Sequence, residues 1–310
     1  MKLAMVYPER AKWPKWSWVA DAARALGHDV RRVGTAIELR EADRWADLVL
    51  FEHKNAGLNI ADILAVARLR KSRWVQWWFD LLATDAGQPL AEQRLVKAFL
   101  PVMRAMDRVF VKERGLLAQY RELGINAAYL DQGCPSAMRA CAHRERPEFD
   151  VVIWGTAGSD YRQRMADVRA LVKRGFSAVW AGHPSGSLPR RVVPVPFVPA
   201  LNLPKLASRA ALVLCVDYRH DLDGYWSDRL WLALGAGNCV VRRDTPGLDP
   251  ALPCYVYQDA AQLIELVAGL KADHEHRRAM GEAARRYTLA GHTYEHRLRE
   301  LLNHHCEAET

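Results

Sequence analysis

Short apolar segments alternate with amphipathic helical segments along almost the whole chain, and this alternation constrains the fold more than any other feature of the sequence. The first run extends from LAMVY near the N-terminus to NAAYLDQG, which ends at residue 133. Strands that alternate with helices of about ten residues form a parallel sheet with helices on both faces. The sequence therefore predicts an α/β fold.

The alternation stops once and then resumes. The segment CAHRERPEF (141–149) is polar and contains Pro147, so we interpret it as a linker, and a second run begins at DVVIWG (150–155). We predict two Rossmann-like domains, residues 1–145 and 146–310, and expect the last helix, TYEHRLRELLNHH, to be able to pack back on the first domain. Two such domains facing each other leave a cleft lined by the carboxyl ends of both sheets, where ligands bind in folds of this kind.

Missing motifs exclude several classes of protein. The chain has no apolar stretch of roughly 18 to 20 residues and no signal-peptide pattern, so we expect a cytoplasmic protein without a membrane span. The first strand leads into YPERAKWPKW and not into G-x-G-x-x-G, and the P-loop, H-E-x-x-H and G-x-S-x-G motifs are absent. The formal net charge of +8 favours phosphate-bearing partners.

The segment 218–248 contains the best candidate for a phosphate site. Ser227 lies where an apolar-periodic helix begins, which makes it a natural N-cap, and Arg229 follows in the first turn. The N-terminus of a helix and a forked guanidinium together suit a diphosphate. The alternative is a capped surface helix with a solvated arginine, and these residues alone do not separate the two.

Five short segments occur in a fixed order through residues 150–300. They are IWGTAGSDYR (153–162), the S-x-R helix start at Ser227 and Arg229, G-x-G followed by a strand and a P-G-L turn (Pro246, Gly247, Leu248), D-x-x-x-L (Asp259, Leu263) and H-T-Y-x-x-R (His292, Thr293, Tyr294, Arg297). This ordered set resembles the donor-site region of GT-B glycosyltransferases, especially the small group related to spore-maturation glycosyltransferases. The first half of the chain resembles them more loosely, at ALGHDV (25–30).

The resemblance implies a hexosyltransferase of the GT-B fold, with a nucleotide-sugar donor, best a UDP-sugar, on the second domain and the acceptor on the first. It also implies no obligatory metal, because helix dipoles and cations can neutralise the leaving diphosphate. Many retaining relatives have a ribose-binding glutamate where this chain has Leu232, so ribose recognition would fall to Asp217 or Asp228. The expected donor-binding residues are Gly155, Thr156, Arg162, Asp217, Ser227, Asp228, Arg229 and Gly237.

An inverting glycosyltransferase also needs a base near the acceptor hydroxyl. The candidates lie at the carboxyl ends of strands in the first domain: Asp80 after RWVQWWF, and Glu52 and His53 after ADLVLF. Asp80 is the first choice, because its tryptophan-rich strand would place it at the mouth of the cleft. The alternative is that Asp80 caps the turn that follows.

The acceptor is the least determined part of the function. The loop before the first helix mixes cations with aromatic residues, a combination that suits phosphates with a stacked base or a sugar ring on tryptophan. Phage enzymes that glucosylate hydroxymethylated DNA bases resemble this chain in size and basic character, so duplex DNA is the best single acceptor, with its base flipped out. Polysaccharide, protein and small-molecule acceptors remain open, as do a nucleotide-sugar epimerase and a non-catalytic DNA-binding protein. The expected acceptor-binding residues are Arg10, Lys12, Trp13, Lys15, Trp16 and Trp18.

Overall fold

The computed structural model describes residues 1–8, 15–52, 57–155, 161–182, 188–196 and 198–306. The chain divides into two compact units, each built on its own parallel sheet. Unit 1 contains Met1–Gln132, the short segment Leu222–Tyr225 and the chain from Tyr294 onward, and unit 2 contains Gly133–Asp221 and Trp226–Thr293. Among the described residues, no helix is long and apolar enough to cross a membrane.

The sheet of unit 1 has the strand order β2-β1-β3-β4-β5-β6, and every pair of neighbours is parallel. β3 is apolar on both faces and completely buried, as expected for a central strand with helices on each side. The chain adds β2 on one side of β1 and then returns to add β3 and the later strands on the other side, which is the doubly wound arrangement. The strands are β1 Lys2–Val6, β2 Asp29–Val33, β3 Leu48–Glu52, β4 Arg73–Trp77, β5 Arg108–Val111 and β6 Ala127–Tyr129.

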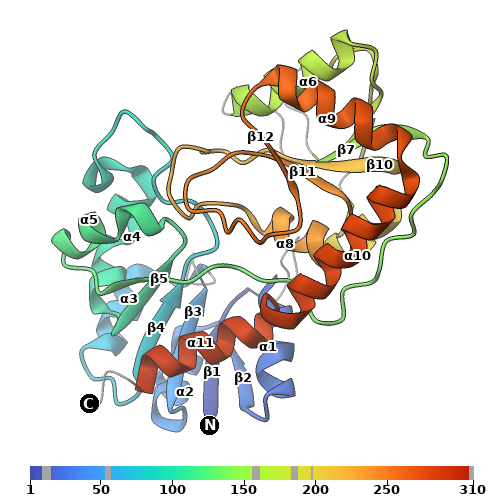
Figure 1. Ribbon diagram of the computed structural model, residues 1–310. Helices are drawn as coiled ribbons and strands as arrows, with labels where there is room; N and C mark the ends of the chain where they lie inside the picture. The colour runs from blue at the N-terminus through green and yellow to red at the C-terminus, as the bar shows by residue number, and fades with distance from the viewer. Residues whose placement is uncertain (9–14, 53–56, 156–160, 183–187, 197, 307–310) are drawn as a thin grey trace. The chain divides into compact units, whose positions relative to one another are not determined.

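The helices of unit 1 cover both faces of this sheet. Right-handed crossovers place α1 on one face and the helices that follow β2 on the other, where α2, α3 and α4 pack in sequence. The C-terminal helix α11 packs beside α1, and its residues Tyr294, Leu298 and Leu301 are fully buried (Figure 1). The helices are α1 Lys15–Ala25, α2 Ala36–Trp45, α3 Ile60–Ala67, α4 Arg94–Ala105, α5 Leu117–Glu122 and α11 Tyr294–Cys306.

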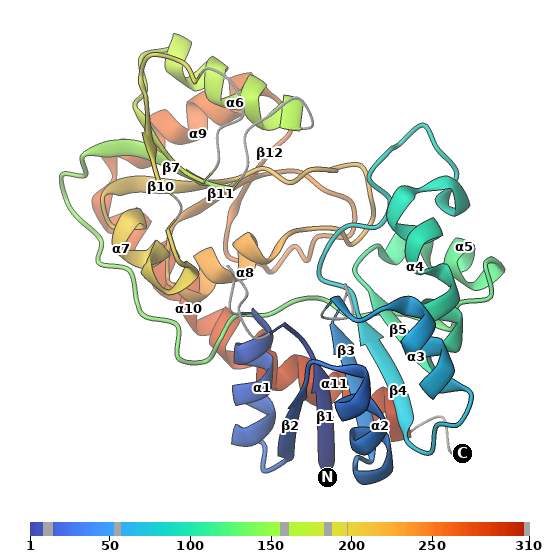
Figure 2. The ribbon, with the colours of Figure 1, turned by 180° about the vertical axis from the view of Figure 1, so that it is seen from behind.

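Unit 2 repeats the same plan with the strand order β12-β11-β10-β7-β8-β9, again parallel throughout. Its apolar core lies between the sheet and the helices α6 and α9. Figure 2 shows these two helices side by side next to the sheet. Helices α8 and α10 pack together. The elements are β7 Phe149–Trp154, α6 Arg162–Lys173, β8 Ala178–Ala181, β9 Val192–Val195, α7 Leu203–Ala207, β10 Ala210–Cys215, α8 Asp228–Gly235, β11 Val240–Arg243, β12 Tyr255–Tyr257, α9 Ala260–Ala272 and α10 His274–Gly291. The predicted α/β class is confirmed.

Candidate functional site

Two glycines form a close backbone contact where β7 and β8 end in unit 2. Gly155 follows β7 with φ +119°, and Gly182 follows β8 with φ +145°, conformations that residues with a side chain rarely adopt. A β-carbon on Gly182 would overlap the carbonyl oxygen of Gly155. That carbonyl also accepts a hydrogen bond of 2.8 Å from Nε1 of Trp180, and the Gly155 N–H donates to Ala181 at 2.9 Å. The turn at Gly155 is therefore fixed from both sides.

Two guanidinium groups approach this turn. A β-carbon built on Gly155 would lie 2.7 Å from Nη1 of Arg229 and 3.2 Å from Nη1 of Arg164, so a side chain there would displace them. The Arg164 side chain is buried, and its Nε donates to the carbonyl of Val216 at 2.9 Å. Its guanidinium lies 4.3 Å from the ring centre of Tyr161. Gly155 thus makes room for two cations at the carboxyl edge of the sheet.

The carboxylate of Asp217 balances part of this charge. Asp217 follows β10 and is only 5% exposed. Its Oδ1 accepts the backbone N–H of Ser227 at 3.0 Å and lies 3.8 Å from Nη2 of Arg229. Its Oδ2 lies 3.4 Å from Nη2 of Arg242, which is buried like Arg164. Arg164, Arg229 and Arg242 thus gather around Gly155 and Asp217, and we call these five residues the arginine cluster. Forked guanidinium groups gathered in this way suit the binding of a diphosphate.

The start of α8 lies in the same cluster. The helix begins at Asp228 with Ser227 as its N-cap residue, as the sequence predicts, but the Ser227 side chain makes no capping hydrogen bond. The Ser227 N–H is donated to Asp217, so this backbone amide is already occupied within the chain.

The glycosyl transferase-like family matches residues 136–303, which is more than half of the chain. The chain belongs to this family. The match includes the whole arginine cluster and every element of unit 2. A comparison with the curated protein sequences found no match.

Solved structures of the same architecture extend the likeness to both units. Anabaena Alr3699/HepE, solved with UDP-glucose, has a TM-score of 0.69 at 11% identity, and the alignment covers 99% of this chain and 100% of that one. The T4 phage enzyme BGT, solved with its UDP-glucose substrate, has a TM-score of 0.62 at 14% identity, with 94% and 96% covered. AviGT4, involved in avilamycin A biosynthesis, has a TM-score of 0.54 at 16% identity, with 94% and 98% covered. The predicted GT-B fold is confirmed.

Within this glycosyltransferase fold, the structure brings together half of the expected donor-binding residues. Gly155, Asp217, Ser227 and Arg229 meet at the carboxyl edge of the unit 2 sheet, as described above. Asp228 lies next to them at the first position of α8 and is 8% exposed. Among the described residues, no group of three His, Cys, Asp or Glu side chains could hold a metal ion.

Two of the other expected donor residues, Arg162 and Gly237, lie elsewhere. Arg162 is exposed at the start of α6, whereas Arg164, which sequence reasoning missed, is buried in the cluster. Gly237 lies at the opposite end of α8 with φ +78°, where its N–H donates to Leu234 at 2.8 Å and ends the helix. Leu232 is buried in α8. Thr156 lies outside the described residues.

The two expected catalytic carboxylates lie at or just after the ends of neighbouring strands of unit 1. Glu52 is the last residue of β3, and its Cα pairs with that of Trp77, the last residue of β4. Asp80 follows three residues later and is half-buried, while Glu52 is only 5% exposed. Both therefore lie at the carboxyl edge of this sheet. His53 lies outside the described residues.

The tryptophans expected to bind the acceptor belong to the core of unit 1. Trp16 is 4% exposed and stacks on Phe79, with ring centres 4.9 Å apart. Trp18 is buried, and its ring centre lies 6.2 Å from that of Tyr294 in α11. Neither presents an aromatic face to an acceptor. The Nζ atom of Lys15 lies 5.9 Å from the centre of the Phe79 ring. Arg10, Lys12 and Trp13 lie outside the described residues.

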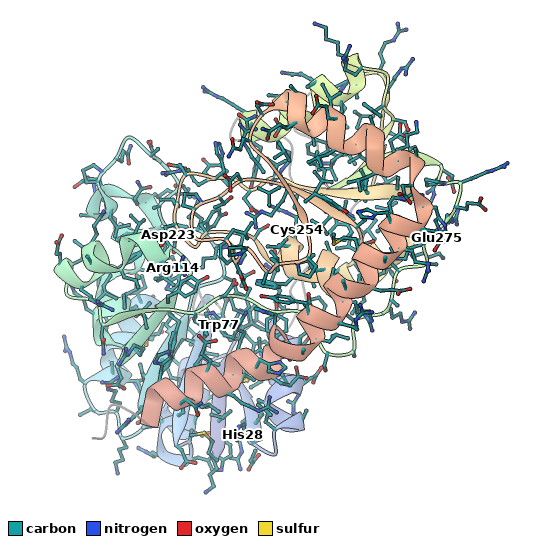
Figure 3. All side chains as sticks on the ribbon, in the orientation of Figure 1. His28, Trp77, Arg114, Asp223, Cys254 and Glu275 are labelled. Carbon is teal, nitrogen blue, oxygen red and sulfur yellow. The ribbon has the colours of Figure 1, made fainter. Side chains whose placement is uncertain are left out.

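One feature that the sequence did not suggest is the attachment of the segment Leu222–Tyr225 within unit 1. Arg114 binds both oxygens of Asp223, with Nε–Oδ2 2.9 Å and Nη2–Oδ1 2.8 Å (Figure 3). This ion pair holds the pKa of Asp223 below its usual range. The Asp223 carbonyl also accepts the Gly115 N–H at 3.2 Å. Along the chain, the segment lies between Asp217 and Ser227, which contact each other beside Arg229.

Proposed function

We propose that this chain transfers a sugar from a UDP-sugar to a hydroxyl group of an acceptor. The observation that carries the proposal is the set of three arginines around Asp217 and Gly155 in unit 2. Guanidinium groups bind phosphate oxygens through paired hydrogen bonds, and Arg164 and Arg242 are already held in place by buried hydrogen bonds. The UDP-glucose complexes of HepE and of the T4 phage enzyme support the choice of nucleotide.

The chemistry needs charge stabilisation at the leaving diphosphate and a base beside the acceptor hydroxyl that attacks the anomeric carbon. The bond between the anomeric carbon and the diphosphate oxygen breaks, and the diphosphate leaves with the electron pair. Arg229 and Arg164 stabilise the charge that develops on it. The acceptor oxygen forms the new bond to the anomeric carbon and gives its proton to a carboxylate. We propose Asp80 as this base, with Glu52 as the alternative.

Donor binding is the first test. UDP and UDP-glucose should raise the melting temperature of the protein by several degrees at about 100 times the dissociation constant, because ligands that bind only the folded state stabilise it. Uridine, which lacks the diphosphate, should have little effect at the same concentration. GDP- and TDP-sugars test the nucleotide. The proposal is wrong if millimolar UDP, GDP and TDP all leave the melting curve unchanged.

For the acceptor, we propose a hydroxymethylated pyrimidine in duplex DNA. The net charge of +8 and the likeness to a DNA-modifying beta-glucosyltransferase support this choice. We expect radiolabelled glucose from UDP-glucose to appear in DNA that contains 5-hydroxymethylcytosine and not in matched unmodified DNA. Label in a polysaccharide, protein or small-molecule acceptor instead would redirect the acceptor assignment.

The same reactions separate two other functions. A nucleotide-sugar epimerase of this fold would release an altered sugar nucleotide with no acceptor present. A non-catalytic DNA-binding protein would bind duplex DNA in a salt-dependent manner and transfer no sugar. Either result would contradict glycosyl transfer to DNA even if UDP binds.

A further inference from the structure

The turn after β4 in unit 1 carries Asp80, and every other residue of the stretch 74–83 is buried. Buried backbone N–H and C=O groups that leave a strand need hydrogen-bond partners. Two side chains act as such partners here, one from the segment after β5 and one from the segment after β6. They are Glu113 and Gln132, and both are fully buried. The proposed reaction assigns no role to either of them.

Glu113 holds the turn on the far side of Asp80. Its Oε1 accepts the backbone N–H of Leu82, with an N–O distance of 2.6 Å. The side chain comes from the segment that follows β5, the strand that pairs with β4. Burial raises the pKa of Glu113, so its surroundings favour a neutral side chain over a charged one. A neutral side chain with an acceptor oxygen should therefore serve the turn as well.

Gln132 holds the turn on the near side of Asp80. Its Nε2 donates to the backbone carbonyl of Phe79, with an N–O distance of 2.5 Å. The backbone carbonyl of Gln132 accepts Nε of Arg297 in α11 at 3.0 Å. Arg297 belongs to the H-T-Y-x-x-R segment, and it is thus connected to the residue before Asp80 through one side chain.

We propose that Glu113 and Gln132 are positioning residues, which hold Asp80 where it can take the proton of the acceptor hydroxyl. A general base works only within hydrogen-bond reach of that proton, and a displacement of about 1 Å can cost about 100-fold in rate. The two side chains bind the residue before Asp80 and the second residue after it. The inference rests on the proposed sugar transfer with Asp80 as the base.

Glu113→Met and Gln132→Met remove these hydrogen bonds and keep the approximate size of the side chains. Each should lower kcat about 10- to 100-fold. The KM for UDP-glucose should change by less than about twofold, because the proposed donor site belongs to unit 2. Glu113→Gln keeps an acceptor oxygen and should retain kcat within about threefold. In an Asp80→Asn background, Glu113→Met should lower kcat by less than about twofold further, since the base that it positions is already lost.

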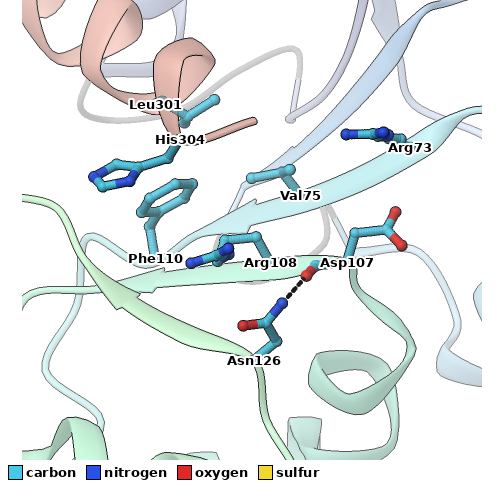
Figure 4. Close-up of a pocket in the computed structure, with 8 residues that line it drawn as sticks. All are labelled: Arg73, Val75, Asp107, Arg108, Phe110, Asn126, Leu301 and His304. Atoms are coloured by element: carbon cyan, nitrogen blue, oxygen red, sulfur yellow. Dashed lines mark hydrogen bonds between the residues drawn. The ribbon is translucent and has the colours of Figure 1, made fainter. Parts of the chain in front are cut away.

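Asp43 provides a matched control at the opposite end of β4. It is also a buried carboxylate that binds the backbone of a turn, and its Oδ2 accepts the N–H of Lys71 at 2.8 Å. Figure 4 shows the amino ends of β4 and β5, where the Asn126 side chain donates a hydrogen bond to the carbonyl of Asp107. Asp43→Leu should lower the melting temperature, as Glu113→Met does, but keep kcat within about twofold at temperatures where both variants are folded.

Hydrogen–deuterium exchange provides a readout that does not depend on catalysis. Peptides that cover residues 78–83 should exchange faster in Glu113→Met than in the original chain or in Asp43→Leu. Unchanged exchange in these peptides would overturn the inference. It would show that the turn keeps its structure without the Glu113 hydrogen bond.

The kinetic results separate a failure of the inference from a failure of the proposed function. If Asp80→Asn loses activity while either Glu113→Met or Gln132→Met keeps it, the inference is wrong and the proposed transfer stands. If Asp80→Asn keeps full activity, the assignment of the base is wrong and the inference fails with it. A loss in Glu113→Gln as large as that in Glu113→Met also contradicts the inference, because the Glu113 charge would then matter and not its hydrogen bond.

Discussion

Replacing Arg229 with alanine should lower kcat/KM for sugar transfer by about 10²- to 10³-fold, the usual effect of removing one donor that stabilises developing charge. The Arg229 guanidinium lies at the Gly155 turn, and its side chain is only 18% exposed, so water cannot fully replace it. Asp217 keeps its bonds to Ser227 and Arg242 in this variant, and we therefore expect unit 2 to remain folded. Kinetics with varied donor and a parallel melting curve measure the two effects separately.

Arg162→Ala is the matched control for this experiment. It removes the same charge from the start of α6, but the Arg162 side chain is exposed, so donor binding and kcat/KM should change by less than about twofold. A loss in Arg162→Ala as large as that in Arg229→Ala would mean that Arg164, Arg229 and Arg242 do not form the diphosphate site. Normal kinetics in Arg229→Ala would contradict the assignment directly.

The pair Arg162 and Arg164 shows how far the sequence could predict the site. Both follow the glycine turn at Gly155, and the family resemblance favoured the first. Residues two apart on a helix point in nearly opposite directions, so only one of them can face the cluster. Arg164 occupies the apolar stripe that continues at Val168 and Leu171. A cation in such a stripe is a signal for a buried charge with a specific partner, and it was available in the sequence.

The tryptophans of the first helix illustrate a different limit. Trp16 and Trp18 follow a basic loop, and a mixture of cations and aromatic residues in one short segment suggests a binding surface. The sequence of this short segment does not show which distant residues its tryptophans contact in the folded chain. Trp16 packs against Trp77, the last residue of β4, and Phe79, and Trp18 packs against Tyr294 in α11. These partners lie about 60 and 280 residues further along the chain. Long-range packing therefore made these residues part of the core.

The fold was easier to predict, because parallel strands that are buried on both faces are apolar throughout, as in β3 and β10. Two elements were missed for identifiable reasons. α2 (Ala36–Trp45) buries only Leu39, Ala42 and Asp43, and a capping box between Thr35 and Glu38 stabilises its start. β9 contains Pro194, which is tolerated because β9 is an edge strand with β8 as its one neighbour.

Asp80→Asn should lower kcat by about 10²- to 10⁴-fold and leave the affinity for UDP unchanged. The amide keeps the shape of the side chain but cannot accept the acceptor proton at neutral pH. Asp80 is favoured over Glu52 because it is half-buried, and so reachable by an acceptor, while Glu52 is 5% exposed. The readout is the rate of UDP release in the presence of the acceptor, followed across pH.

Glu52→Gln is the matched comparison, since it makes the same chemical change at the end of the neighbouring strand. If Asp80 is the base, Glu52→Gln keeps most of the activity and the same pH profile, whereas Asp80→Asn loses the fall in rate that accompanies protonation of the base at acid pH. The opposite pattern would assign the proton transfer to Glu52. Full activity in both variants would exclude both carboxylates, because neither amide can take the proton that an inverting transfer releases from the acceptor oxygen.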